Sequence, residues 1–245
     1  MQTKQFFPLI SALLFMIFLV LNADAQTRTG TIKYKQTMFF EFENMPPNMP
    51  KSSDAYMQLK FNGVEALYEK DPDVKDDQSA DASDGSRRWR RMRDRSKRIL
   101  YSNTGTSSVV EQTGLMGKDF LISDSLKNLK WKISAGEQKS ILGYTCMKAT
   151  FKDSLRNIAV FFTPQIPLQH GPDNFGGLPG IILEVQSAQM HILATEMIAG
   201  TPVITPPSKG DKMTRAEFNR LREEKMKEQR EMWGRGGNEV RVIRQ

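Results

Sequence analysis

Short runs in which apolar and polar residues alternate are the feature that most restricts the fold of this chain. The first run begins at Thr31 and continues to Phe42, with apolar side chains at almost every second position. Similar runs follow at residues 55–61, 63–68, 98–102, 107–112, 118–122, 129–134, 140–152, 157–163, 181–186 and 191–198. A repeat of two is typical of a β-strand with one buried face. No intervening segment has the length and periodicity of a crossover helix. We therefore expect a mainly β protein built on one curved antiparallel sheet, open or half-barrel in shape.

The composition fits a single globular domain. The chain has 245 residues, of which 39% are hydrophobic, and this is enough to bury one core. We expect that domain to cover residues 26–207 and the sheet to end at Pro202, Pro206 and Pro207.

A charged segment interrupts the expected sheet at residues 69–98. Its first half is rich in acidic residues, and residues 87–98 are dominated by arginine and lysine. Because this segment has few apolar residues, the burial of its side chains cannot offset the conformational entropy lost on ordering. We therefore expect a mobile loop. The basic half could contact nucleic acid, the phosphates of anionic envelope lipids, or the acidic half beside it.

The C-terminal residues 208–245 have a different character. Thr214 and Glu217 have the spacing of a capping box, which predicts a charged helix that runs to about Trp233 and ends in a Gly-rich tail. A final strand is possible at residues 240–243. The apolar face of a curved sheet must be covered, and we expect this helix or a bound apolar ligand to cover it.

The first 25 residues have the pattern of a cleaved signal peptide. Lys4 precedes an uncharged run at residues 6–21, and Ala23-Asp24-Ala25 provides small residues for cleavage before Gln26. The run is shorter than the roughly 20 residues of a membrane-spanning helix. No cysteine follows it, so we expect an exported, non-lipoprotein chain in the periplasm or at the outer membrane. Export also argues against a nucleic acid partner, and we expect no transmembrane segment after cleavage.

The sharpest local motif is Gly177-Leu178-Pro179-Gly180-Ile181-Ile182. Proline at the second position and glycine at the third position of a turn predict a type II turn, with positive φ at Gly180, before a strand. The motif has a structural role, and none of its side chains carries a reactive group.

With this motif the chain resembles the GLPGLI family of exported proteins from bacteria of the Bacteroidetes kind. Ile181 stands where that family has leucine, a replacement that preserves volume. Segments 131–133, 141–149 and 166–172 also resemble the family pattern. The resemblance implies a β-rich exported fold of unassigned activity, in some cases associated with outer-membrane transport systems, and it implies no catalytic residue.

Cys146 is the single cysteine of the chain. It could be buried and inert, a metal ligand, a nucleophile, or half of an intermolecular disulfide. A cysteine hydrolase would need His170 or His191 beside it, and the sequence gives no support for either pairing. We expect His170, in a loop, to make a polar or metal contact, and His191 to be a half-buried structural residue on a strand.

Methionine residues suggest one possible cofactor. Met45 and Met49 lie in a proline-rich stretch, and Met147 follows Cys146. Thioether and thiolate ligands select Cu(I), so Met45, Met49, Cys146, Met147 and His170 form a candidate copper set. Methionine is also a common filler of apolar cores, which is the competing interpretation.

No phosphate-binding loop, nucleophile elbow, zinc-protease motif or EF-hand spacing occurs in the sequence. We therefore expect an exported, non-enzymatic binding or accessory protein of the cell envelope. Its partner would be an apolar ligand, an anionic lipid or an outer-membrane transport protein. A periplasmic copper-binding protein and a cysteine-dependent hydrolase are the alternatives.

Overall fold

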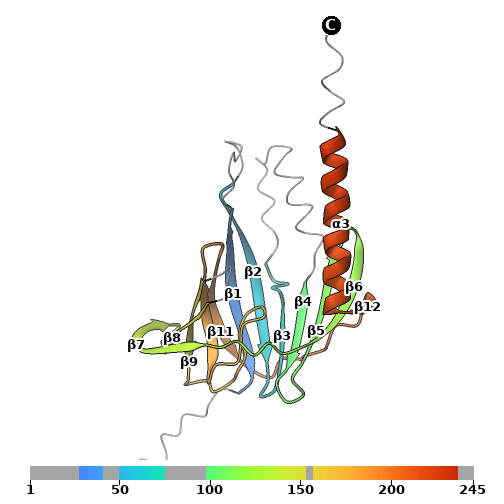
Figure 1. Ribbon diagram of the computed structural model, residues 1–245. Helices are drawn as coiled ribbons and strands as arrows, with labels where there is room; N and C mark the ends of the chain where they lie inside the picture. The colour runs from blue at the N-terminus through green and yellow to red at the C-terminus, as the bar shows by residue number, and fades with distance from the viewer. Residues whose placement is uncertain (1–27, 41–49, 75–97, 153–156, 237–245) are drawn as a thin grey trace, which may run out of the picture.

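The computed structural model describes residues 28–40, 50–74, 98–152 and 157–236 (Figure 1). They form one sheet and one helix. The strands are β1 (Gly30–Phe39), β2 (Ser52–Phe61), β3 (Glu65–Lys70), β4 (Ile99–Asn103), β5 (Ser108–Leu115), β6 (Lys118–Ser125), β7 (Lys132–Ile141), β8 (Tyr144–Lys152), β9 (Asn157–Thr163), β10 (Ile181–Gln186), β11 (Met190–Ala199) and β12 (Asp211–Thr214), and the helix is α3 (Arg215–Gly236).

The twelve strands follow the order β12-β6-β5-β4-β3-β2-β1-β11-β10-β9-β8-β7. Every neighbouring pair is antiparallel except β12 with β6, which is parallel. Strands β12 and β7 are the two ends of the order, so the sheet is open. The prediction of one open, mainly antiparallel sheet with a C-terminal helix is confirmed.

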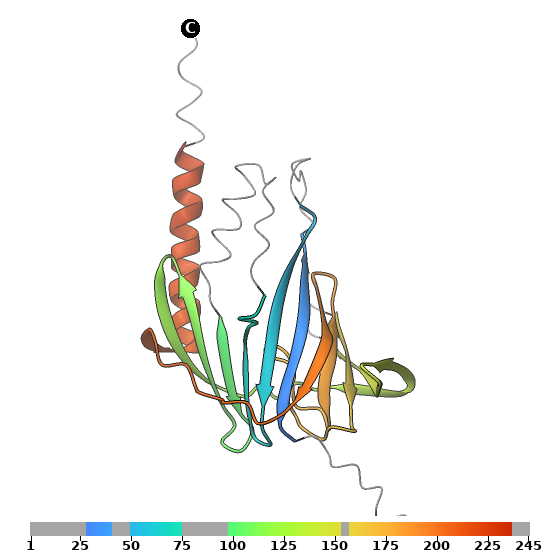
Figure 2. The same cartoon turned by 180° about the vertical axis from the view of Figure 1, so that it is seen from behind.

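The sheet does not end at the prolines, as the sequence had led us to expect. Residues 200–210 leave β11 and cross to the far end of the sheet (Figure 2), where β12 pairs with β6. Prolines end a strand locally, but they do not prevent the chain from rejoining the sheet elsewhere. Residues 211–214 therefore belong to the sheet and not only to the helical tail.

The predicted single strand at residues 140–152 is in fact the end of β7, a tight turn and β8. Leu142 and Gly143 form the turn with φ of 51° and 83°. Positive φ at both central residues is the requirement of a type I′ hairpin. Glycine supplies it without strain at the second position, but a leucine at the first position conceals the turn from a sequence-based prediction.

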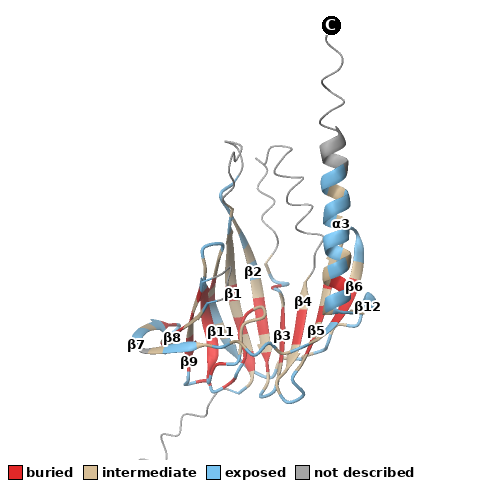
Figure 3. Ribbon diagram, viewed as in Figure 1, coloured by how far each residue is buried: buried red, intermediate tan, exposed pale blue. Residues whose placement is uncertain are grey.

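One face of the sheet carries the main core. In β1, Ile32 and Tyr34 are buried while the lysines beside them point to the other face, and Figure 3 shows the same alternation in neighbouring strands. Residues 164–180 cover this face, because Ile166, Leu168 and Leu178 are buried in the same core. The expectation that the helix or a ligand covers the face is wrong for this region, since the chain supplies its own covering segment.

Gly180 is glycine for a different reason from the one predicted. It is not among the residues with positive φ; within its motif Gly177 has that conformation, with φ of 83°. A Cβ atom on Gly180 would lie 2.1 Å from the carbonyl oxygen of Thr163 and 2.9 Å from Cα of Pro164. Strand β10 therefore starts where two backbones pass in contact, and a sequence alone does not reveal such an approach.

Helix α3 packs on the sheet only through its first turns. The Thr214 backbone N–H and hydroxyl donate to Glu217 Oε2 at 2.7 and 2.8 Å, so the predicted capping box is confirmed. Phe218 lies edge-on to Phe120, with ring centroids 5.6 Å apart, and forms a small second core with Ile122. Beyond these turns the helix rises past the end of β6 (Figure 1).

The boundaries of the expected charged loop need correction. Glu69 and Lys70 belong to β3, and buried Asp71 forms an ion pair with Lys33 at 3.3 Å. Arg98 is likewise held by ion pairs. Helix α3 continues to Gly236, past the expected end near Trp233. Loop residues 75–97, the signal peptide, Met45, Met49 and residues 237–245 lie outside the described residues.

Candidate functional site

Charged side chains from five parts of the chain meet at the N-terminal end of α3, which we call its foot. Arg215, the first helical residue, binds Glu111 of β5 at 2.6 Å and Asp124 of β6 at 3.1 Å. Arg98, just before β4, binds the same Glu111 at 2.8 Å and also forms an ion pair with Asp173. Asp173 belongs to the covering segment 164–180, so a chain of ion pairs through Arg98 and Glu111 links that segment to the helix.

Glu111 is only 5% exposed, and its two arginine partners favour its ionised form. Burial alone would raise its pKa, but hydrogen bonds and charge interactions with Arg98 and Arg215 prevail and hold the pKa below its usual value. For Arg98, burial opposes the charged form, while Asp173 and Glu111 raise its pKa. A buried carboxylate bound by two guanidinium groups fixes geometry, and it offers no free group for catalysis. We call these five residues the foot cluster; they fix the direction in which α3 leaves the sheet.

The part of α3 after Leu221 has a surface of mixed charge. Exposed residues of both signs alternate along it, with an ion pair of 2.8 Å between Lys225 and Glu228. Met226 is 47% exposed. A helix that is polar on all sides either bridges to another domain or partner, or depends on its own side-chain pairs. The foot cluster and this projecting surface together form the candidate functional site.

A second cluster lies around Glu184, which is 2% exposed. Its carboxylate forms an ion pair with Lys139, lies within hydrogen-bond distance of His191 Nε2 at 2.8 Å, and accepts a hydrogen bond of 2.6 Å from Gln186. Burial raises the pKa of Glu184, but these partners outweigh burial and lower it. Lys139 also lies 4.0 Å above the Phe161 ring. The cluster ties β7 to β10 and β11. The sequence could not reveal it, because the partners meet only through strand register.

Cys146 lies in the main core with no exposed surface. Burial raises the pKa of its thiol to about 11. The S–H group donates a hydrogen bond to the Tyr144 carbonyl at 3.5 Å. Since the thiolate is the reactive and metal-binding form, the structure fits the buried, inert interpretation of this residue.

The histidines differ in their surroundings. His170 belongs to the covering segment and is 3% exposed, with Nε2 buried and without a hydrogen-bond partner. Burial lowers its pKa to about 4, although hydrogen bonds with the backbone at Asn62 and Gly63 act in the opposite direction. His191 is half-buried on β11 and pairs with Glu184, as expected for a structural residue.

The described members of the candidate copper set are Cys146, Met147 and His170. Cys146 and Met147 are consecutive on β8 and therefore point to opposite faces. Within the described ranges, no group of three or more histidine, cysteine or acidic residues is arranged to hold a metal ion. Copper binding stays a prediction, which a Cu(I) titration of the mature protein would test.

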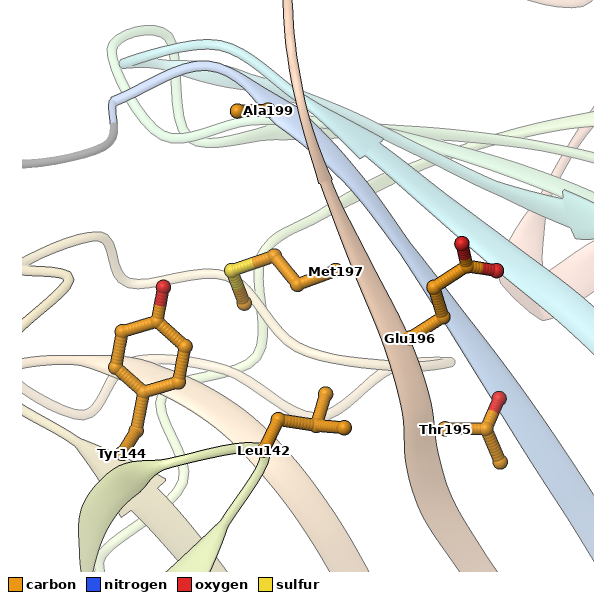
Figure 4. A pocket seen from close by; sticks show the side chains of 6 residues that line it. All are labelled: Leu142, Tyr144, Thr195, Glu196, Met197 and Ala199. Atoms are coloured by element: carbon orange, nitrogen blue, oxygen red, sulfur yellow. The ribbon is translucent and has the colours of Figure 1, made fainter.

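A shallow pocket of about 350 Å³ opens between the tip of the β7–β8 hairpin and β11. The side chains of Leu142, Tyr144 and Met197 gather around it (Figure 4). The sequence did not indicate this pocket. It is mostly apolar, and its lining supplies no paired acid and base for chemistry.

Comparisons with known proteins assign no activity, and the comparison with solved structures supports the fold. A family model described as "Protein of unknown function (Porph_ging)" matches residues 152–184, which include the Gly177–Ile182 motif. No curated protein matches the chain. Two solved structures of PNGF-II, in different space groups, are similar, with TM-scores of 0.55 and 0.54 and sequence identities of 15% and 16%. The matches cover 80% and 79% of this chain but only 33% and 32% of PNGF-II. This chain therefore spans about a third of the length of those structures, and the likeness shows the fold alone.

Among the described helical residues, none form a segment with the length and apolar character needed to cross a membrane.

Proposed function

We propose that this protein is an exported, non-enzymatic accessory protein of the cell envelope that binds a partner protein through helix α3. The observation that carries the proposal is the contrast within that helix. Its foot is fixed by Arg215, Glu111 and Asp124 and by the Phe218 contact, while the remainder projects with its charged side chains exposed. Fixing the foot reduces the entropy lost when the projecting part binds.

Three other features support the proposal. The N-terminal pattern of a signal peptide favours export, and the motif at Gly177–Ile182 resembles that of the GLPGLI family. The apolar face of the sheet is filled by residues 164–180, so a partner surface is a better candidate than an apolar ligand in the hollow. The mixed charges of α3 favour a protein partner with complementary charges, such as an outer-membrane transport protein, over a purely anionic lipid surface.

Charge reversal on α3 tests the proposal. A tagged mature protein would be expressed in its host, and the proteins that co-purify from detergent-solubilised envelopes would be quantified by mass spectrometry. Replacing the exposed residues Arg222, Lys227 and Arg230 by glutamate should remove a specific envelope partner. Three exposed lysines on the sheet and its connections, Lys118, Lys127 and Lys130, provide the matched control when they are reversed in the same way. Equal recovery with both triple variants, or fractionation of the protein with the cytoplasm, would overturn the proposal.

A further inference from the structure

Residues 201–209, with the sequence TPVITPPSK, form an extended strap between β11 and β12. Figure 2 shows this proline strap passing in front of the sheet near one end of its strands. Among the described residues, no backbone–backbone hydrogen bond joins residues 201–209 to the rest of the chain.

The prolines fix the conformation of the strap. Pro202, Pro206 and Pro207 each hold φ near −65°. The residue before a proline is also driven to an extended conformation, and this applies to Thr201 and Thr205. Five of the nine strap residues are thus biased to the region of polyproline II, a left-handed helix with three residues per turn.

Most of the strap is accessible. Pro202, Ile204 and Pro207 are half-buried, whereas the other residues of the strap, including Val203, Pro206 and Lys209, are exposed. In a polyproline II conformation these last three residues, spaced three positions apart, lie on one edge of the strap. Val203 is 80% exposed, the highest value among the exposed large apolar residues of the described chain.

Both ends of the strap are attached to the sheet. At its C-terminal end, a Cβ atom on Gly210 would lie 2.8 Å from the backbone of Asp119, so the two chains pass in contact. Lys209 forms an ion pair with Asp119 at 3.1 Å, and its side chain is 78% exposed. An anchored, already extended segment loses little conformational entropy when it binds.

We propose that the proline strap is a docking site for a partner protein that recognises polyproline II through a groove lined with aromatic side chains and acidic at one end. Such grooves receive side chains spaced three residues apart between aromatic rings. Val203 and Pro206 supply two apolar side chains at that spacing, about 9 Å apart. Lys209 adds a positive charge at the next step, and this charge selects the acidic end of the groove. Its surface ion pair with Asp119 is weak enough to be exchanged.

Site-specific photo-crosslinking in the host tests the period of the contact. The crosslinker p-benzoylphenylalanine would replace Val203, Thr205 or Pro206, one at a time, in the full chain. Thr205 is an exposed neighbour on another edge of the strap and serves as the matched control. Positions 203 and 206 should capture the same protein, and position 205 much less of it. Equal capture at all three positions, or no capture at any, would overturn the proposal.

Titration of the captured protein, once purified, tests the chemistry of its groove. Its tryptophan or tyrosine fluorescence should change when the mature protein is added. Val203→Asp or Pro206→Ala should weaken binding at least tenfold, and Lys209→Glu should weaken binding and reduce its dependence on salt. Thr205→Ser and the triple charge reversal on α3 should bind as the wild type does, which separates this site from the proposed function of the helix. Unchanged affinity in Val203→Asp and Pro206→Ala would contradict the proposal.

Discussion

Individual residues show that the same amino acid can be required for a reason other than the one a motif suggests. Gly180 was expected to supply a positive φ, but the structure requires it because two backbones come into contact. Cys146 and His170 are candidate reactive groups in the sequence, but both are buried in the structure. Three predictions follow from these environments.

Replacing Gly180 by alanine should lower the free energy of unfolding by about 1–3 kcal/mol, the usual cost of overpacking. The new Cβ atom would meet backbone atoms of Thr163 and Pro164, which cannot move aside as a flexible side chain could. Chemical denaturation would measure the change. Gly63→Ala is the control, because no atom lies within 4 Å of its added Cβ and its φ is not positive. Equal stability of the two variants would show that the contact is absent.

The thiol of Cys146 should be unreactive in the native protein. With its pKa raised to about 11 and no exposed surface, almost no accessible thiolate exists at pH 8. A chromogenic disulfide reagent should therefore label it only after denaturant is added. Rapid labelling of the folded protein at pH 8 would contradict this prediction and would revive the interpretation of Cys146 as a nucleophile.

His170 should make stability fall in mild acid. Its folded-state pKa of about 4 lies below the unfolded value of 6.5, so the unfolded chain binds the proton first as the pH falls. The free energy of unfolding should thus decrease between about pH 6.5 and pH 4, by up to about 3 kcal/mol, and be unaffected by this group above pH 7. The carboxyl groups of Glu111 and Glu184, whose pKa values are lowered from 4.5, stabilise the fold in neutral solution and lose this contribution only as the pH falls below about 5.

Denaturation curves at several pH values would measure the effect of His170. In His170→Gln the decrease between pH 6.5 and about pH 5 should disappear, whatever the absolute stability of that variant. The same slope in both proteins would mean that another group titrates in this window.

Among the secondary-structure elements, α3 is attached to the sheet by its first turns, and the rest of its length adds little to that attachment. Phe218 is the one α3 side chain among residues 215–231 that is fully buried, and it packs on Phe120. Phe218→Ala should cost about 3–5 kcal/mol or, if the helix detaches locally, make α3 sensitive to limited proteolysis. Met226→Ala, on the exposed part, should do neither. Resistance of the Phe218→Ala helix to protease, together with unchanged stability, would contradict the assignment of the foot.

The covering segment 164–180 has a similar dependence on contacts that are distant in sequence. Trp131 Nε1 donates a hydrogen bond to the Gly176 carbonyl at 2.9 Å, and Tyr34 Oη donates to the Ile182 carbonyl at 2.7 Å. The motif Gly177–Ile182 is thus the junction at which this segment rejoins the sheet. Its conformation follows from these partners and from strand register more than from its own turn propensity.

For the whole molecule, the prediction concerns the last part of the chain. A chain that ends at residue 207 should keep the main core, whose buried members lie before that point. It should lose the second core and expose the paired edge of β6, where Phe120 and Ile122 lie. We expect a strand-rich circular dichroism spectrum, lower stability and self-association detected by light scattering, because an uncovered edge strand pairs with other chains. A monomer as stable as the full chain would show that β12 and α3 do not protect the sheet.

The sequence by itself determined the alternation of buried and exposed faces, the open antiparallel sheet and the capped C-terminal helix. These depend on patterns only a few residues long, which act through local backbone geometry. The tertiary structure alone decided what fills the apolar face, how the chain returns to the sheet as β12, and which charges meet around Glu111 and Glu184. The backbone contact at Gly180 belongs to the same group. Each of them requires strand order and register, which bring together residues far apart in sequence, and no local pattern specifies those distances.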